Sequence, residues 1–155
     1  MRPTAATAAT AATAAEPPGR WALALGYAGA LPFVAGALVM ATDDPLPRAM
    51  AADALNAYAA VIVSFLGGIH WGLGMARSMP GPAPFLWGVV PSLVAWAAVL
   101  WDGRVGLGLM ALTLLVCLAV DHRVYPRRGL TAWRPLRWRL SLVAALCCGV
   151  AALRL

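Results

Sequence analysis

The side chains best suited to chemistry in this sequence lie inside one long apolar run, residues 51–76. His70 is the main candidate, because an ionisable group at the centre of a membrane costs roughly 2.5–3.5 kcal/mol on insertion scales. Asn56 lies fourteen residues earlier, and at about 100° per residue it falls within about 40° of His70 on a helix. Ser64 and Trp71, seven residues apart, share a neighbouring stripe. We interpret these four side chains as a candidate polar or ligand-binding stripe.

A second group of polar residues surrounds the last connection between apolar runs. Asp121 closes the fourth run, and Arg137 and Arg139 stand at the start of the fifth. In the topology derived below, these residues, His122 and His70 all lie on the inner side of the membrane. Two interpretations stay open. One is a proton-handling or ligand site built on the imidazole. The other is a structural clamp in which Asp121 pairs with an arginine and His70 bonds to a backbone carbonyl or to water.

Known catalytic and metal-binding patterns are missing from the sequence. It contains no G-x-S-x-G, P-loop, G-x-G-x-x-G or H-E-x-x-H motif. Cys117, Cys147 and Cys148 lack metal-ligand spacing, and all three fall inside apolar runs. We therefore predict no catalytic residue, no metal site and no cofactor, and we expect a protein that is not an enzyme.

Composition indicates a membrane protein. The chain has 155 residues, of which 62% are hydrophobic and only 12% charged, whereas soluble domains carry about 25% charged residues. The mean hydropathy is +0.77. The apolar residues gather in runs near twenty residues long, which is the length that crosses about 30 Å of hydrocarbon.

These runs predict an all-α polytopic membrane protein, a bundle of five transmembrane helices. Residues 1–19 form a Thr/Ala-rich tail that has little to bury and is expected to be disordered. Residues 20–155 form the membrane domain, with kinks expected at Pro32 and Pro91. The predicted spans are about 21–40, 51–76, 85–101, 105–120 and 137–153.

Arginine placement predicts the orientation, because short cytoplasmic loops are enriched in basic residues. All twelve basic residues are arginines. With the N-terminus inside, nine lie on the cytoplasmic side: Arg2, Arg20, Arg77, Arg123, Arg127, Arg128, Arg134, Arg137 and Arg139. Three lie outside: Arg48, Arg104 and Arg154. We therefore expect a cytoplasmic N-terminus and an external C-terminus.

Small residues at a spacing of four mark candidate helix contacts, since they let backbones approach closely in lipid. Gly68 and Gly72 form one such row, and Gly26 is the centre of another in the first span. We predict that one of these rows packs against a neighbouring helix of the same chain. A homodimer seam is the alternative.

The basic segment 121–139 is predicted to be a long loop that lies on the membrane surface. From Trp133 to Arg139 it alternates aromatic and cationic residues, and each arginine near an anionic surface contributes about 1 kcal/mol. Its expected partners are anionic lipid headgroups. We expect no nucleic-acid partner, because the arginines flank apolar runs.

The run from Tyr58 to Gly72, YAAVIVSFLGGIHWG, resembles the signature of the transmembrane protein 69 family, also called domain of unknown function 3429. The stretch from Leu25 to Phe33, Pro91, and the stretch from Trp133 to Leu140 fit the same family, so that the resemblance covers about residues 21–153. It implies a small multi-pass protein of a bacterial or mitochondrial inner membrane, and it implies no established activity. We expect the bacterial inner membrane.

Two functions are the main candidates at this level, and a membrane enzyme that uses His70 and Asp121 is a third, less favoured one. The first is a non-enzymatic scaffold, assembly factor or accessory subunit that binds another membrane protein. The second is a small transporter or a lipid- or small-molecule-binding protein that uses the polar stripe around His70. Kinked or broken helices in transporters expose backbone groups to substrate, which is the reason for keeping the second.

Overall fold

A computed structural model describes residues 15–76 and 81–155 of the chain. Within these ranges the ordered elements are helices, and no strand is present. In chain order they are α1 (Arg20–Ala28), α2 (Leu31–Val39), α3 (Pro45–Ala76), α4 (Ala83–Val99), α5 (Gly103–Arg127), the 3-10 helix η2 (Thr131–Trp133) and α6 (Arg134–Arg154). The all-helical prediction is confirmed.

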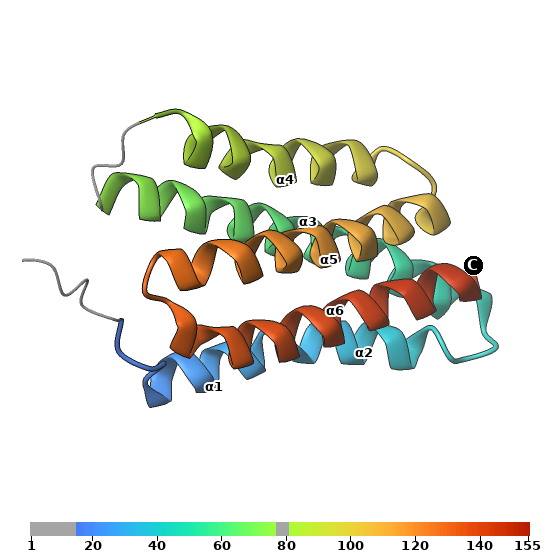
Figure 1. Ribbon diagram of the computed structural model, residues 1–155. Coiled ribbons are helices and arrows are strands. Elements are labelled where there is room, and N and C mark those ends of the chain that lie inside the picture. Colours follow the sequence, from blue (N-terminus) through green and yellow to red (C-terminus); the bar gives the residue numbers. More distant parts are fainter. Residues whose placement is uncertain (1–14, 77–80) are drawn as a thin grey trace, which may run out of the picture.

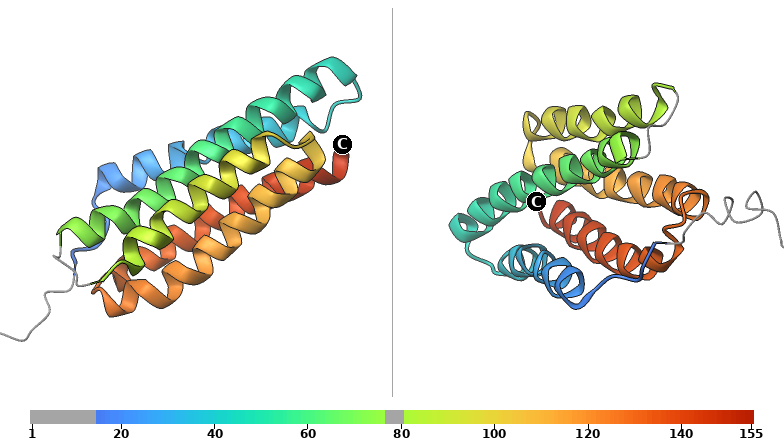
Figure 2. Two further views of the ribbon diagram at one scale, coloured as in Figure 1. Left: turned by 90° about the horizontal axis from the view of Figure 1, so that it is seen from above. Right: turned by 90° about the vertical axis from the view of Figure 1, so that its left-hand side faces the viewer.

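The helices form a bundle of antiparallel rods, in which α1 and α2 follow one another along a single rod (Figure 1). Helix α4 packs against α3 and α5 on one side of the bundle. On the other side, α2 packs against α3 and α6, whereas α1 packs mainly against α6 (Figure 2). The start of α1 and the end of α6 therefore lie at opposite ends of the bundle (Figure 1).

Among the described residues, four helical stretches are long and apolar enough to cross a membrane: Arg20–Val39, Pro45–Ala76, Gly103–Arg127 and Thr131–Arg154. Helix α4 is a shorter apolar helix of 17 residues. It coincides with the third predicted span, and the four longer stretches coincide with the other four.

The first predicted span is broken near its middle. Helix α1 ends at Ala28, and α2 resumes at Leu31 with Pro32 in its first turn. Proline lacks a backbone N–H and cannot donate to the preceding turn. The hydroxyl of Tyr58 donates to the Gly29 carbonyl oxygen at 2.8 Å. A side chain of α3 thus stabilises the break, and the kink expected at Pro32 is confirmed.

Helix α3 begins six residues earlier than predicted. Pro45 and Pro47 occupy its first turn. Backbone N–H groups in the first turn of a helix have no partner within the helix, so their absence in proline costs no hydrogen bond. The Arg48 guanidinium donates to the Thr42 carbonyl oxygen at 2.6 and 3.2 Å and fastens this turn to the preceding segment. The helix has 32 residues and is roughly 48 Å long.

Helices α4 and α5 are joined by a tight turn, as the Asp102-Gly103 pair predicts. Asp102 is the N-cap of α5, and its side-chain oxygen accepts a hydrogen bond from the Val105 backbone N–H at 3.1 Å. Pro91 lies inside α4 and is buried. The two helices are antiparallel neighbours, as expected.

The predicted long loop over residues 121–139 is wrong. Helix α5 continues through Asp121 to Arg127, and α6 begins at Arg134. Residues 128–133 alone separate the two helices, and Thr131–Trp133 of that connection form η2. Hydropathy ended the fourth span at its first charged residue, whereas Asp121 is buried and paired within the bundle, so the helix runs on.

The predicted tail, residues 1–19, falls mostly outside the described residues, which start at Ala15. The Ala15 backbone N–H donates to the Gly129 carbonyl oxygen at 2.8 Å, and Trp133 Nε1 donates to the Glu16 carbonyl oxygen at 3.0 Å. The end of the tail, at Ala15 and Glu16, therefore lies against the connection between α5 and α6.

Candidate functional site

His70 and Asn56 lie on the buried face of α3. Each is 5% exposed, as expected for residues fourteen apart on one helix face. They occupy different ends of that face and have different partners. His70 meets α5 near its C-terminal end, whereas Asn56 Nδ2 donates to the Ala98 carbonyl oxygen of α4 at 3.4 Å. The polar stripe is therefore two separate contacts.

The centre of the candidate site is Asp121 on α5. Its Oδ1 lies 2.8 Å from His70 Nε2 on α3, and its Oδ2 accepts a hydrogen bond from Arg137 Nε on α6 at 2.5 Å. A carboxylate only accepts hydrogen bonds, so His70 Nε2 is the donor of the first contact. One side chain from each of three helices thus converges on a single point, and we call these three residues the HDR cluster.

The HDR cluster is almost completely buried. The side chains of His70, Asp121 and Arg137 are 6%, 4% and 11% exposed. The His70 ring also meets Trp87 of α4 edge-to-face, with 6.3 Å between ring centroids. A buried ion pair is tolerated only where good geometry and further hydrogen bonds offset the loss of hydration, and Asp121 has both carboxylate oxygens engaged.

The chemistry open to this arrangement is narrow. A His-carboxylate pair can orient an imidazole, but among the described residues no serine or cysteine hydrogen-bonds to His70 as a nucleophile. Within residues 15–76 and 81–155, no group of three or more His, Cys, Asp or Glu side chains could hold a metal ion. Cys117, Cys147 and Cys148 are free thiols. The pair of Asp121 and Arg137 is that of the expected clamp, but His70 contacts Asp121 and not the expected backbone carbonyl or water.

Two of the residues expected at this cluster lie elsewhere. Arg139 donates through Nη1 to the Tyr27 hydroxyl on α1 at 3.0 Å. His122 is exposed and pairs with Arg134. Arg137 and Arg139 are two residues apart, about 200° around a helix, and only one of them can face Asp121. Their joint convergence was a wrong prediction.

Ser64 and Trp71 also lie away from the HDR cluster. Trp71 Nε1 donates to the Phe85 carbonyl oxygen of α4 at 2.8 Å, and its ring meets the Phe85 ring edge-to-face at 5.2 Å. Trp71 therefore joins α3 to α4. Ser64 is half-buried, and we assign it no part in the cluster.

The glycine predictions are partly corrected. A methyl group at Gly26 would lie 3.2 Å from Leu140 Cδ1, so the row of the first span does pack against α6 within the chain. At Gly68 and Gly72, by contrast, a methyl group would meet no described atom within 4 Å. That row is exposed and does not form a close helix contact with the described part of the chain.

The close approach of α3 and α4 uses a neighbouring glycine row that sequence reasoning missed. A methyl group at Gly67 would overlap the Gly88 carbonyl oxygen, and one at Gly74 would lie 2.9 Å from Phe85 Cζ. At Gly88 it would overlap the Trp71 ring. Gly67 precedes Gly68 by one residue, which is a rotation of about 100°. The adjacent glycines Gly67 and Gly68 in the sequence indicate a close helix contact, but they do not indicate which of the two faces α4.

Comparison with known proteins agrees with the resemblance carried by the span around His70. The sequence profile of a family described as "Protein of unknown function (DUF3429)" matches residues 18–153. Transmembrane protein 69 of Xenopus tropicalis is 34% identical over 128 residues, which cover 79% of this chain and 50% of the relative. Transmembrane protein 69 of Mus musculus is 30% identical over 128 residues, which cover 79% of this chain and 51% of the relative.

This chain spans about half the length of the curated relatives it matches. No solved structure matches it.

Proposed function

This chain belongs to the DUF3429 family, and from that premise we propose that it crosses a bacterial inner membrane five times and acts there as a non-enzymatic scaffold, assembly factor or accessory subunit of a membrane complex. That it is a multi-pass membrane protein follows from its apolar helices and its relatives. The number of spans, the orientation and the role are the proposal.

Five spans are supported by α4 and by the broken first rod. At 1.5 Å per residue, the 17 residues of α4 reach roughly 26 Å, close to the hydrocarbon thickness of about 30 Å. Helix α4 also runs alongside α3 through the bundle (Figure 2). With α1 and α2 counted as one span, the chain crosses five times and its two ends emerge on opposite sides.

The orientation is supported by the charge at the two ends of the bundle. Most arginines belong to the end formed by the start of α1 and the connection between α5 and α6, where Arg127, Arg128 and Arg134 stand. Arg104 and Arg154 belong to the other end. Basic loops stay cytoplasmic, so the N-terminus is placed inside. The basic end can then contact anionic headgroups, although it is largely helical.

A reporter that is active only outside the cytoplasm tests the topology. Alkaline phosphatase fused after Leu155 should be active, and the same reporter fused after Gly129 should be inactive. The reverse pattern would overturn the proposed topology, because either the opposite orientation or a helix α4 that does not cross the membrane would produce it. The two fusion sites lie on either side of α6, the last proposed span. Equal reporter activity at both sites would mean that α6 does not cross the membrane, and it would overturn the count of five.

The accessory role is carried by one observation, the internal pairing of the HDR cluster. His70 Nε2 and both oxygens of Asp121 are engaged with one another and with Arg137. Groups that carry protons or do chemistry need access to a substrate, whereas these three side chains are nearly buried and join α3, α5 and α6. A cluster of this kind stabilises a helix arrangement that other proteins can bind.

Purification of the tagged protein at native level in a mild detergent, with mass spectrometry of what co-purifies, tests the role. We expect a membrane protein in stoichiometric amount. Gly68→Leu is a useful companion variant, because it enlarges an outward-facing position without an intrachain contact. Loss of the partner with an intact fold would place the interface on that face. A single species without a protein partner would contradict the accessory role.

A second candidate function is the binding of a lipid or another small apolar molecule. It is favoured by an apolar cavity that adjoins the HDR cluster and contains Arg137. A transporter in the strict sense has less support, because the two cavities beside the broken first rod are lined mainly by apolar side chains.

A further inference from the structure

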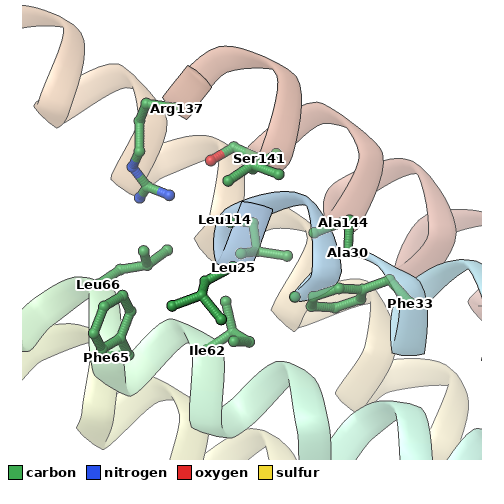
Figure 3. A pocket seen from close by; sticks show the side chains of 13 residues that line it. Leu25, Ala30, Phe33, Ile62, Phe65, Leu66, Leu114, Arg137, Ser141 and Ala144 are labelled. Carbon is green, nitrogen blue, oxygen red and sulfur yellow. The ribbon is translucent and has the colours of Figure 1, made fainter. Parts of the chain in front are cut away.

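An apolar groove runs along the bundle where α1 diverges from α3. A cavity of about 170 Å³ is enclosed by side chains of α1, α3 and α6, with α3 and α6 on opposite sides of it (Figure 3). Its walls are mainly apolar side chains such as Leu25, Phe33, Ile62 and Phe65. The space exists because α1 packs mainly against α6 and not against α3.

A second cavity of about 350 Å³ continues the first toward the basic end of the bundle. Both are lined by Leu25, Phe65, Leu66 and Arg137, and the second adds Trp133. We call the two cavities together the α1–α3 groove. Tryptophan is enriched at the level of lipid headgroups, so Trp133 marks its headgroup end, and Phe33 marks the deep end.

Two polar groups on α6 face this groove. Arg137 uses Nε for Asp121, while its Nη2 is buried and has no hydrogen-bond partner among the described residues. Ser141 is 1% exposed, and its Oγ has no partner in the same described part of the chain. The residues are four apart on one face of α6, and both lie at the cavity (Figure 3). Buried donors without acceptors are uncommon.

The chemistry of the groove specifies its occupant. It offers two hydrogen-bond donors, one of them cationic, at the start of a long apolar channel. The α1 and α3 side chains at its edge are open to the bilayer, with Leu25 70% and Phe65 64% exposed. A ligand that enters between them must come from the lipid phase and must carry acceptor oxygens next to an apolar chain.

We propose that the α1–α3 groove binds one anionic phospholipid. One phosphate oxygen accepts from Arg137 Nη2, and an ester carbonyl accepts from Ser141 Oγ one turn deeper. One acyl chain fills the channel toward Phe33. Charge complementarity favours an anionic lipid over a zwitterionic one, because Arg134 and Arg139 adjoin Arg137 on the same helix end. This lipid site requires that the chain is inserted in a membrane, as proposed above, but it does not depend on the proposed accessory role.

Native mass spectrometry of the full chain in detergent tests the proposal, with phosphatidylglycerol and phosphatidylcholine as the probes. We expect one phosphatidylglycerol per chain, bound about tenfold more tightly than phosphatidylcholine. Ile62→Trp fills the groove and should weaken binding at least about tenfold. Val61→Trp is the matched control, since Val61 is the adjacent residue, 64% exposed, and does not line the groove.

A second pair of variants tests the polar end without changing side-chain volume. Ser141→Ala removes one hydrogen bond and should weaken phosphatidylglycerol binding about fivefold. Ser64→Ala, on α3 and outside the groove, should leave it unchanged. If size-exclusion chromatography shows that Ile62→Trp does not fold, the comparison of Ser141→Ala with Ser64→Ala decides whether the groove binds the lipid.

The proposal is overturned by equal affinity for the two lipids, by an equal effect of Val61→Trp and Ile62→Trp, or by an unchanged affinity of Ser141→Ala. These outcomes concern lipid binding alone. A failure to find a protein partner would contradict the accessory role and would leave the lipid site standing.

Discussion

Gly67→Ala should destabilise the protein, whereas Gly68→Ala should not. The two glycines are adjacent in α3, so their substitutions change composition and helix propensity equally. At Gly67 the added methyl group would overlap the Gly88 carbonyl oxygen and would lie 3.2 Å from the Gly88 carbonyl carbon and 3.4 Å from Pro91 Cγ. At Gly68 it would meet no described atom within 4 Å.

The magnitude follows from this overlap. The Gly88 oxygen belongs to the backbone and cannot rotate away, so α3 and α4 must separate by roughly 1 Å to restore ordinary contact distances. Overpacking of this kind costs about 1–3 kcal/mol. The gain in helix propensity from glycine to alanine, up to about 1 kcal/mol, is common to both variants and cancels in their difference. The unfolding equilibrium should therefore differ by roughly 5- to 150-fold between them.

Reversible unfolding in mixed micelles, followed by circular dichroism, measures this difference. Gly88→Ala should resemble Gly67→Ala, because its methyl group would overlap the Trp71 ring on the other side of the same contact. Equal stability of the Gly67 and Gly68 variants would refute the reasoning. So would a Gly68 variant that is the less stable of the two.

Three further predictions concern hydrogen bonds in the structure, and the same unfolding experiment measures each. Arg137→Ala leaves the Asp121 carboxylate buried with only its His70 contact and should lower the free energy of unfolding by about 3–5 kcal/mol. Adding Asp121→Asn should recover part of this loss, and no recovery would mean that the two charges are not coupled. Tyr58→Phe removes the hydrogen bond to the broken first rod and should cost about 1 kcal/mol, so an unchanged stability would contradict the role given to that hydroxyl. Asp102→Ala removes the N-cap of α5 and should lower the free energy of unfolding by about 1 kcal/mol. The control Asp53→Ala, at an exposed position, should leave stability unchanged. Equal effects of the two variants would mean that the loss of a negative charge, and not the loss of the cap, is responsible.

That His70, Asp121 and the Arg137/Arg139 pair lie at the same end of the bundle was predictable from the sequence, because it needs only the order of the spans. The exclusion of Arg139 was not predicted, although it follows from the 200° between residues two apart on a helix. Which of the two arginines faces Asp121 depends on how α6 is rotated, and that rotation is set by packing against α5 and α2.

The α5 boundary shows a second limit. Hydropathy treats Asp121 as the end of an apolar span, since a lone carboxylate is costly in lipid. In the structure the cost is offset by His70 and Arg137, which lie far away in the sequence. Helix α5 therefore continues to Arg127. A local average of hydropathy contains no information about such partners.

The sequence by itself determined that the chain is helical, that it belongs in a membrane, that its first span breaks near Pro32 and which end is basic. These properties follow from the lengths of apolar runs, from prolines and from charges, all of which act locally. The tertiary structure alone decided which face of each helix turns inward: Gly67 instead of Gly68, Arg137 instead of Arg139, and the α1–α3 groove with Ser141 inside it. In a soluble protein, polar and apolar faces reveal that rotation, but in lipid the outer face is as apolar as the inner one. The rotation of each helix is therefore set by close packing and by paired polar groups.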